Sequence, residues 1–341
     1  MNKQALEQAL LGFGKARVAL IGDFCLDLYE IADMRLSELS RETPLFPYPI
    51  VEERFSAGGA GNVAANMASL GPEKLTAIGL TGQDWREGLL RQALEKAGVP
   101  TESLVQIPGL VTNTYLKTLR KGISSVVYEA PRLDFENRKP TPPAEEQALL
   151  EKLEQGDFQV LAVSDQLGFG AITPRVRERI LSLAREGKQV LVDSRDRIDL
   201  YPGCLVKPNE IEALRAFGEP GESLPEHRQE LPEFALKLLP RVVEKTGAPA
   251  VITLGDQGCV YWEGEPRYCP ACRVEGETDI SGAGDTFLAA LTVALSSGLS
   301  LGEAVSIAGM ASAVTVKKIG ITGTASPGEI LKLAETGGFR E

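Results

Sequence analysis

A single acidic residue follows directly on a turn of small residues in the stretch 278–287, TDISGAGDTF. Gly282–Gly284 form the turn, and the apolar residues that follow predict a buried helix over 286–295. The first amides of a helix lack partners inside it and carry partial positive charge, so they attract anions such as phosphate. A carboxylate held beside a bound anion is electrostatically costly. The pattern therefore indicates that Asp285 does chemistry there, removing a proton from a hydroxyl group that attacks phosphorus.

Two further groups of polar residues lie where α/β proteins place ligands. Gly58 and Gly59 begin the run GGAGN, which ends at Asn62 and opens a helix-like segment. The glycines predict either a close-packed turn before a buried helix or a close approach of the backbone to a ligand, with the Asn62 amide facing hydroxyl groups. Asp23 and Asp27 follow the first apolar strand, where carboxylates suit sugar hydroxyls. A helix cap or a solvated turn is the alternative for each carboxylate.

Two more polar groups follow later strands. Asn209 and Glu212 lie in the run KPNEIE, whose spacing forms a capping box at a helix start. The same residues equally suit hydrated Mg²⁺ beside nucleotide phosphates. Thr253, Gly255 and Gly258 end a strand and form a tight turn over which a nucleotide can pass. Spacing alone does not choose between these alternatives.

Several common chemistries are excluded by residues that the chain lacks. It has no GxxxxGK[ST] phosphate loop and no GxGxxG after its first strand, which argues against nucleotide sites of those types. Its one histidine, His227, lies in a polar segment, which leaves no multi-histidine metal site. The five cysteines include one CPAC pair, Cys269 and Cys272, for which an ordinary structural role is favoured over a zinc site or a redox disulfide. The other three are expected to be buried.

Composition narrows the class of partner. The 341 residues carry a net charge of −11 and a pI of about 4.9, which argues against nucleic acid or an anionic membrane surface as a partner. No apolar run approaches the roughly 18 residues of a membrane span. Residues 1–16 are typical of an amphipathic helix without an export signal, so we expect a cytoplasmic protein.

The elements that must position these residues alternate between short apolar strands and helices. Strands are expected at 17–22, 75–79, 160–164, 189–193, 204–207 and 250–254. Helices are expected at 84–97, 144–153, 174–186, 209–217 and 233–246. This alternation predicts a mostly parallel sheet with helices on both faces. Segments 28–57 and 110–134 interrupt it and predict a small β-sheet lid over the site.

Taken in order, these segments resemble the ribokinase-like (PfkB) carbohydrate kinases from about Val18 to Ile330. The specific parts are 58–66 (GGAGNVAAN), 207–212 (KPNEIE) and 279–287 (DISGAGDTF). Within that family the chain is most similar to the kinases of D-glycero-β-D-manno-heptose 7-phosphate, on segments 22–29, 41–44, 52–54, 58–71, 132–136 and 163–165. The resemblance implies a ribokinase-like three-layer α/β/α fold with a small β lid, as one kinase domain over 1–341.

The resemblance also implies a role for each candidate residue. Asp285 would be the general base, and the transferring phosphoryl group would meet the amides of Gly282, Ala283 and Gly284. The sugar would be held by Asp23, Asp27, Gly58, Gly59, Asn62, Arg132 and Asp134. ATP would be held by Asn209, Glu212, Thr253, Gly255 and Gly258, with Glu212 reaching Mg²⁺ through water. Asp279 would border a site for a monovalent cation such as K⁺.

The chain departs from the heptose kinases in regions that could hold substrate phosphate or nucleotide. Those kinases carry SDYxKG where this chain has SDQLGFG at 164–170, and DPK where it has Asp193-Ser194-Arg195. An Asn near the adenine is also replaced, in the stretch 308–310.

We therefore expect an ATP-dependent kinase that phosphorylates heptose 7-phosphate at its anomeric hydroxyl. Another sugar or sugar phosphate is the first alternative, and a non-catalytic sugar- or nucleotide-binding regulator on the same fold is the second. A homodimer through the lid edges is expected. The nucleotidyltransferase activity of bifunctional relatives is expected to be absent, because 341 residues with one histidine leave no room for that domain.

Overall fold

The first apolar run of the chain forms the strand at the centre of the fold. In the computed structural model, β1 (Arg17–Gly22) lies between β4 and β9 and is buried on both faces. Val18 and Leu20 belong to one hydrophobic cluster, and Ala19 and Ile21 belong to the other. A strand covered on both sides has no face for polar residues, which explains why the run is continuously apolar.

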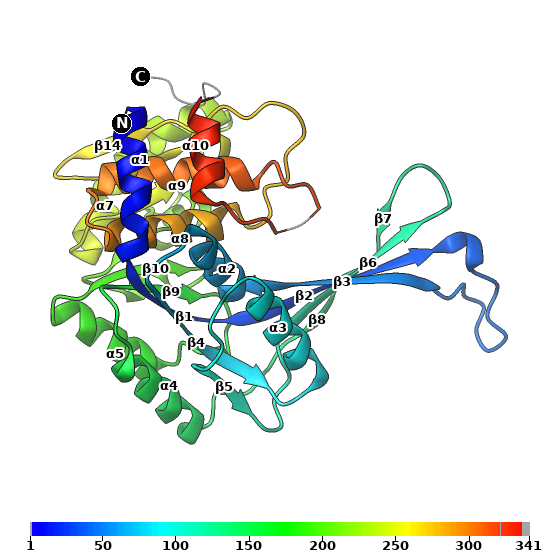
Figure 1. Cartoon of the computed structure of the whole chain (residues 1–341). Helices are drawn as coiled ribbons and strands as arrows, with labels where there is room; N and C mark the ends of the chain where they lie inside the picture. The colour runs from blue at the N-terminus through cyan, green and yellow to red at the C-terminus, as the bar shows by residue number, and fades with distance from the viewer. Residues whose placement is uncertain (1, 321, 336–341) are drawn as a thin grey trace.

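Six parallel strands make the central sheet, in the order β11-β10-β9-β1-β4-β5 (Figure 1). The structure describes residues 2–320 and 322–335. The strands beside β1 are β4 (Lys74–Gly82), β5 (Leu104–Ile107), β9 (Val160–Asp165), β10 (Gln189–Ser194) and β11 (Leu205–Val206). The predicted parallel sheet is confirmed.

Helices pack against both faces of this sheet. One face carries α1 (Lys3–Gly12), α2 (Ala60–Leu70), α3 (Trp85–Lys96), α8 (Ala283–Ser296), α9 (Leu301–Thr315) and α10 (Pro327–Glu335). The other carries α4 (Pro143–Gln155), α5 (Pro174–Arg185), α6 (Glu210–Phe217) and α7 (Leu231–Thr246). Short 3₁₀ turns lie at 13–15, 34–36, 198–200, 228–230 and 255–257. The three-layer arrangement expected from the sequence is therefore present.

A second sheet extends away from the central one as a long arm (Figure 1). Its strands are β2 (Phe24–Asp33), β3 (Ile50–Gly59), β6 (Thr114–Lys121), β7 (Tyr128–Glu129) and β8 (Leu133–Phe135). They pair in the order β3-β2-β6-β7, with β8 also on β6. Both segments expected to form a lid contribute strands to this sheet.

The strand expected at 250–254 belongs to a different sheet from the one predicted. β12 (Val251–Thr253) pairs antiparallel with β13 (Cys259–Trp262), which pairs with β14 (Pro266–Cys269). It meets the β11 end of the central sheet only through two isolated parallel bridges. A tight turn returns the chain at once, so β13 takes the hydrogen bonds that a further parallel strand would have used.

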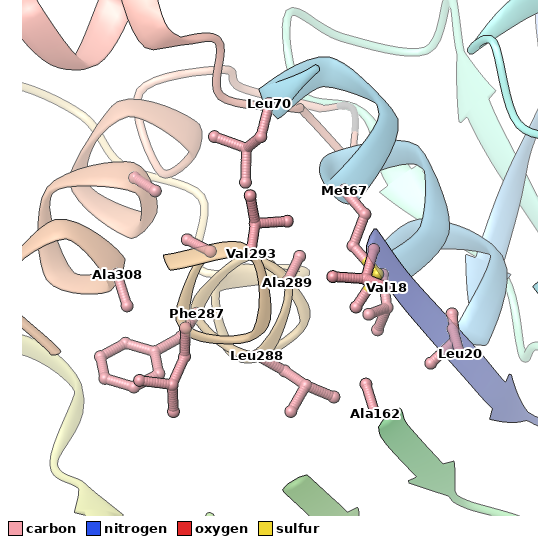
Figure 2. Close-up of a cluster of buried hydrophobic side chains, with 14 of the residues drawn as sticks. Val18, Leu20, Met67, Leu70, Ala162, Phe287, Leu288, Ala289, Val293 and Ala308 are labelled. Carbon is pink, nitrogen blue, oxygen red and sulfur yellow. The ribbon is translucent and has the colours of Figure 1, made fainter. Parts of the chain in front are cut away.

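Helix α8 is deeply buried in the larger core. Phe287 through Ser296 are all buried. Figure 2 shows Leu288, Ala289 and Val293 of α8 among side chains of α2, β1, β9 and α9, with Met67 and Ala162 close by. A helix packed on all sides cannot shift without disturbing the core, so its first turn is rigidly held.

The cysteines, the helix lengths and the clustering of acidic, histidine and cysteine side chains complete the description of the fold. Cys25, Cys204 and Cys259 are buried as expected, and Cys269 and Cys272 are half-buried free thiols. Within residues 2–320 and 322–335, no helix is long and apolar enough to cross a bilayer. The same residues contain no cluster of three His, Cys, Asp or Glu side chains suited to a metal ion.

Candidate active site

The small-residue turn before Asp285 is built around Gly282, the N-cap of α8. Its φ of 78° lies in the left-handed region that favours glycine. A Cβ at this position would stand 2.5 Å from Nδ2 of Asn62, which also requires glycine. The turn therefore brings the start of α8 directly against α2.

The amides at the start of α8 are only partly available for an anion. The Ala283 N–H donates to the Ile280 carbonyl at 3.2 Å, so one of the three amides assigned to the phosphoryl group is already paired. The N–H groups of Gly282 and Gly284 have no acceptor in the part of the chain that the structure describes. The anion site is thus narrower than predicted, with these two amides at its centre.

Asp285 is held by a side chain that the sequence assigned to the sugar. Nδ2 of Asn62 donates to Oδ2 of Asp285 at 2.8 Å. Asn62 is only 2% exposed, and its Oδ1 accepts from Nδ2 of Asn66 at 3.2 Å. One N–H of the Asn62 amide therefore orients the carboxylate, and the expected contact of Asn62 with a sugar hydroxyl stays a prediction.

The surroundings of Asp285 suit a base that works near neutral pH. The pKa of Asp285 is raised to about 7, chiefly by burial and to a smaller extent by the nearby carboxylates of Asp193 and Asp27. The hydrogen bond from Asn62 and the ammonium group of Lys207 act in the opposite direction. A proton acceptor is most effective when its pKa lies near the working pH.

A buried cation, Lys207, stands at the start of α8. Its side chain is almost fully buried, and its Nζ lies 3.1 Å from Oδ2 of Asp193. Nζ also lies 3.9 Å from the point where a Cβ would stand on Gly284. Burial acts to lower the pKa of Lys207, but the charges of Asp193 and Glu212 outweigh it, so the net shift is upward and the ammonium stays charged.

Sequence reasoning overlooked Lys207 and Asp193 as site residues. Each is a charged residue that ends or follows a continuously apolar strand, β10 for Asp193 and β11 for Lys207. Charges at the carboxyl ends of buried parallel strands usually mark a ligand site. That signal was present in the sequence and applies to both residues.

The two glycines at the base of the lid pack against the chain itself. A Cβ on Gly58 would stand 2.5 Å from Oδ2 of Asp27, and one on Gly59 would stand 2.6 Å from the Asp23 carbonyl. Gly59 also has a φ of 54°. The close-packed turn, one of the two alternatives for GGAGN, is therefore what the structure contains.

Asp27 lies on β2 with basic side chains around it. Burial raises the pKa of its carboxyl group, whereas the charges of Lys117 and Arg132 lower it. Arg132 forms an exposed ion pair with Asp134 at 2.6 Å and stacks 4.6 Å from the Tyr115 ring. Arg132 is thus close enough to Asp27 to influence its charge, and Asp134 pairs with Arg132.

The Asp23 carboxylate is held by backbone amides of the loop that follows β9. Its Oδ2 accepts the N–H groups of Gln166 and Leu167, both at 2.8 Å, and its Oδ1 accepts that of Ala171 at 2.7 Å. A carboxylate with three backbone donors has little acceptor capacity left for a sugar hydroxyl. Asp23 therefore anchors the loop after β9, and its expected contact with a sugar stays a prediction.

The residues assigned to the nucleotide meet at one corner of the sheet. Asn209 and Glu212 form the capping box of α6: the Asn209 side chain accepts the Glu212 N–H at 2.8 Å, and Glu212 Oε2 accepts the Asn209 N–H at 2.9 Å. A parallel bridge joins Asn209 to Thr253. The structural alternative is thus present, and the second oxygen of Glu212 is not used by the box.

Three further predicted site residues, Gly255, Gly258 and Asp279, shape or connect loops of the chain. Gly255 and Gly258 have φ values of 59° and 88°, and a Cβ on Gly258 would stand 2.2 Å from the Cys269 carbonyl. Asp279 accepts the N–H groups of Ser281 and Gly320, each at 3.0 Å. The Asp279 carboxylate therefore ties together two loops beside the start of α8.

Comparison with known proteins places these features in one family. A model of the pfkB family carbohydrate kinase matches residues 15–327. The bifunctional protein HldE of Gluconobacter oxydans is 32% identical over 331 residues, which cover 93% of this chain and 64% of that protein. HldE of Trichlorobacter lovleyi is also 32% identical and is matched over 65% of its length. The chain thus spans about two thirds of the length of these curated relatives.

Solved structures show the same fold at lower sequence identity. A ribokinase of Arabidopsis thaliana, complexed with ribose and ATP, aligns with a TM-score of 0.69 and 19% identity over 94% of this chain and 98% of its own. Phosphofructokinase-2 of Escherichia coli, in complex with fructose-6-phosphate, aligns with a TM-score of 0.70 and 21% identity over 94% and 99%. The ribokinase-like fold expected from the sequence is confirmed.

Proposed function

The chain belongs to the pfkB family of carbohydrate kinases and is an ATP-dependent sugar kinase, and from this premise we propose that Asp285 is its general base. In the proposed step a sugar hydroxyl gives its proton to Asp285 and its oxygen bonds to the γ-phosphorus of ATP. The bond from that phosphorus to the β-γ bridging oxygen breaks, and ADP leaves with the electron pair.

One observation carries this proposal: the Asp285 carboxylate lies beside two unpaired helix amides and a buried ammonium group. The amides belong to Gly282 and Gly284, and the ammonium belongs to Lys207. Donors fixed in a buried site stabilise the charge that develops on a transferring phosphoryl group. The same groups have no evident use in a protein that only binds sugar.

For the sugar we propose Asp27 as a ligand of hydroxyl groups, with the backbone at Gly58 and Gly59 beside it. The favoured substrate is D-glycero-D-manno-heptose 7-phosphate, phosphorylated at its anomeric hydroxyl. Similarity to proteins named HldE supports the heptose assignment. The cations of Lys117 and Arg132 around Asp27 suit a substrate that already carries a phosphate. Another sugar or sugar phosphate is the alternative.

For the nucleotide we propose Asn209, Thr253, Gly255 and Gly258 as neighbours of ATP. Mg²⁺ usually keeps several waters and takes one or two carboxylates together with phosphate oxygens. The oxygen of Glu212 left over by the capping box fits that pattern as a contact through water. Bound Mg²⁺ would offset charge on the phosphates.

A monovalent cation bordered by Asp279 is also part of the proposal. The Asp279 carboxylate already accepts two backbone amides, so its contribution to such a site would be partial. Measuring turnover in K⁺ against the same concentration of tetramethylammonium tests this point. Equal rates in the two salts would remove the cation from the proposal.

We further propose that one kinase domain over 1–341 acts in the cytoplasm as a homodimer joined through the lid. Many of the exposed large apolar side chains lie on the lid arm: Leu36, Leu39, Leu45, Phe46, Ile50, Val51, Ile123, Val126, Val127 and Leu133. An apolar surface of this extent usually meets a partner. Light scattering of the purified protein is expected to give about twice the mass of one chain, and a single-chain mass would contradict the dimer.

The proposed function is tested by measuring ADP release over a panel of sugars and sugar phosphates. We expect kcat/KM to be higher for heptose 7-phosphate than for every other compound tested. A higher kcat/KM for another sugar would keep the kinase and replace the substrate. Binding of ATP and sugar without any ADP release would favour the non-catalytic regulator.

A further inference from the structure

A buried line of polar side chains runs from α8 across α2 and back to Asp285. The Thr286 hydroxyl lies 3.1 Å from each of two acceptors, Oδ1 of Asn66 and the Gly282 carbonyl oxygen, which share its single proton. Nδ2 of Asn66 donates to Oδ1 of Asn62 at 3.2 Å, and Nδ2 of Asn62 donates to Oδ2 of Asp285 at 2.8 Å. Thr286 and Asp285 are adjacent in the chain, so the line forms a closed loop between two helices.

The direction of each amide in this line follows from its neighbours. Nδ2 of Asn66 faces the carbonyl oxygens of Asn62 at 3.0 Å and of Gly323 at 3.4 Å, and carbonyl oxygens only accept hydrogen bonds. The other end of the Asn66 amide is therefore its oxygen, which receives the Thr286 hydroxyl. Asn62 must then turn its own oxygen toward Asn66 and its N–H₂ toward Asp285.

Water cannot take over these contacts. Asn66 is 0% exposed, Thr286 is 1% exposed and Asn62 is 2% exposed. Buried polar networks are highly directional because each member has few alternative partners. The Asn66 side chain does not reach Asp285 itself, so its effect on the base passes through Asn62, whereas Thr286 also contacts the Gly282 carbonyl of the turn before Asp285.

We propose that Asn66 is a positioning residue for phosphoryl transfer, which orients Asn62 so that Oδ2 of Asp285 is occupied and Oδ1 is left to take the proton. Thr286 supports Asn66 in the same role. This inference rests on the proposed function, because it gives Asn66 a role only if Asp285 is the base.

The line also bears on the charge of Asp285. The hydrogen bond from Asn62 favours the ionised carboxylate, and so does Lys207 after β11. Asp193 at the end of β10 and Asp27 on β2 act against ionisation of Asp285. The thiol of Cys25 on β2 is also near, because the charge of Asp285 helps to raise its pKa. Loss of the oriented donor leaves the opposing groups in place, so Asp285 would take up a proton at higher pH.

The test compares Asn66→Leu with a matched pair of threonine substitutions on α8. Thr286→Val removes the hydroxyl that holds Asn66. Thr292→Val removes an equally buried hydroxyl, which donates to the Leu288 carbonyl at 2.7 Å and has no contact with the line. Thr286→Ser keeps the hydroxyl and serves as the conservative control. For each variant, kcat, KM and the pH dependence of kcat/KM are measured, together with the thermal midpoint.

Asn66→Leu is expected to lower kcat by about 10-fold to 10²-fold, the range for a misoriented catalytic group, with KM for ATP and sugar changed little. The acid limb of its kcat/KM profile is expected to move to higher pH by about 0.5 to 1 unit. Thr286→Val should show a smaller shift in the same direction, and Thr286→Ser and Thr292→Val should show none.

Wild-type kcat and an unmoved acid limb in folded Asn66→Leu would overturn the inference, as would equal behaviour of Thr286→Val and Thr292→Val. If Asn66→Leu does not fold, the threonine pair decides alone. Failure of the proposed function has a different signature: Asp285→Asn would then keep its turnover. An inactive Asp285→Asn beside an unchanged Asn66→Leu would contradict only the positioning role.

Discussion

Asp285, which is partly exposed at the start of α8, and Asp23, which is buried after β1, are two carboxylates with raised pKa values but different surroundings. Burial raises the pKa of Asp285 to about 7 and that of Asp23 to about 6. Asp23 accepts three backbone N–H groups from the loop 166–171. Asp285 accepts one hydrogen bond, from the side chain of Asn62, and stands beside Lys207.

The contrast shows that a raised pKa does not by itself identify a base. Three backbone donors use the acceptor capacity of Asp23, so this carboxylate serves the fold. Asp285 keeps one oxygen without a partner among the described residues and lies beside unpaired helix amides. Spare acceptor capacity next to an anion site, rather than the pKa shift alone, separates the two roles.

A large effect is expected from removing Lys207, whose charge favours the ionised form of Asp285. Lys207→Met should lower kcat by about 10² to 10³, because losing one fixed donor to a transition state costs about 2.7–4 kcal/mol. The measurement is steady-state ADP release at saturating substrates. The double variant Lys207→Met/Asp193→Asn avoids an unpaired buried carboxylate and serves as the control. A rate within threefold of wild type in the double variant would contradict a role for Lys207.

Asp23→Asn should affect stability far more than chemistry. An amide offers one acceptor oxygen in place of two, so at least one buried N–H of the loop would face an NH₂ group. We expect the free energy of unfolding to fall by about 2–3 kcal/mol, the range for lost hydrogen bonds to a charged group. Urea unfolding measures this change. Unchanged stability together with a lost affinity for sugar would instead place Asp23 in the substrate site.

Two glycines of the loop 166–171 test the contact between this loop and Asp23. A Cβ on Gly170 would stand within 2 Å of Oδ1 of Asp23, at 1.9 Å, whereas one on Gly168 would meet nothing within 4 Å. Gly170→Ala is expected to lower the free energy of unfolding by about 1–3 kcal/mol through overpacking, and Gly168→Ala is the matched control. Equal thermal midpoints for the two variants would mean that the loop is not pressed against Asp23.

A further effect is the pH dependence of stability that Asp285 contributes. Its pKa in the folded protein, about 7, lies above its ordinary value of 3.8, so ionisation favours the unfolded chain. Wild-type stability should therefore fall between about pH 4 and pH 7 relative to Asp285→Asn, by on the order of 1 kcal/mol per pH unit. Urea unfolding across this window measures the difference. A constant difference would show that Asp285 titrates normally.

The sequence predicted most elements and the small-residue turn before Asp285 because both depend on local patterns. Continuous apolar runs marked β1, β9 and β10, and the small-residue turn marked the start of α8. The family resemblance rested on the same turn and was confirmed.

What the sequence could not supply were contacts between distant residues. Asp23 meets amides more than 140 positions away, at Gln166, and Asn62 meets Asp285 across 223 positions. Residue type and spacing do not determine which of two polar groups will pair across a fold. The contacts that Asp23 and Asn62 make within the chain could not be predicted for this reason.

The most direct test of Asp285 as the proton acceptor is a single-turnover measurement of phosphoryl transfer. Wild type and Asp285→Asn are each saturated with ATP, Mg²⁺ and the best sugar at pH 8, and substrate affinities are measured separately. The variant is expected to transfer phosphate about 10³-fold more slowly, within the range for loss of a general base, with affinities unchanged within about threefold. Transfer at the wild-type rate would contradict the assignment of Asp285.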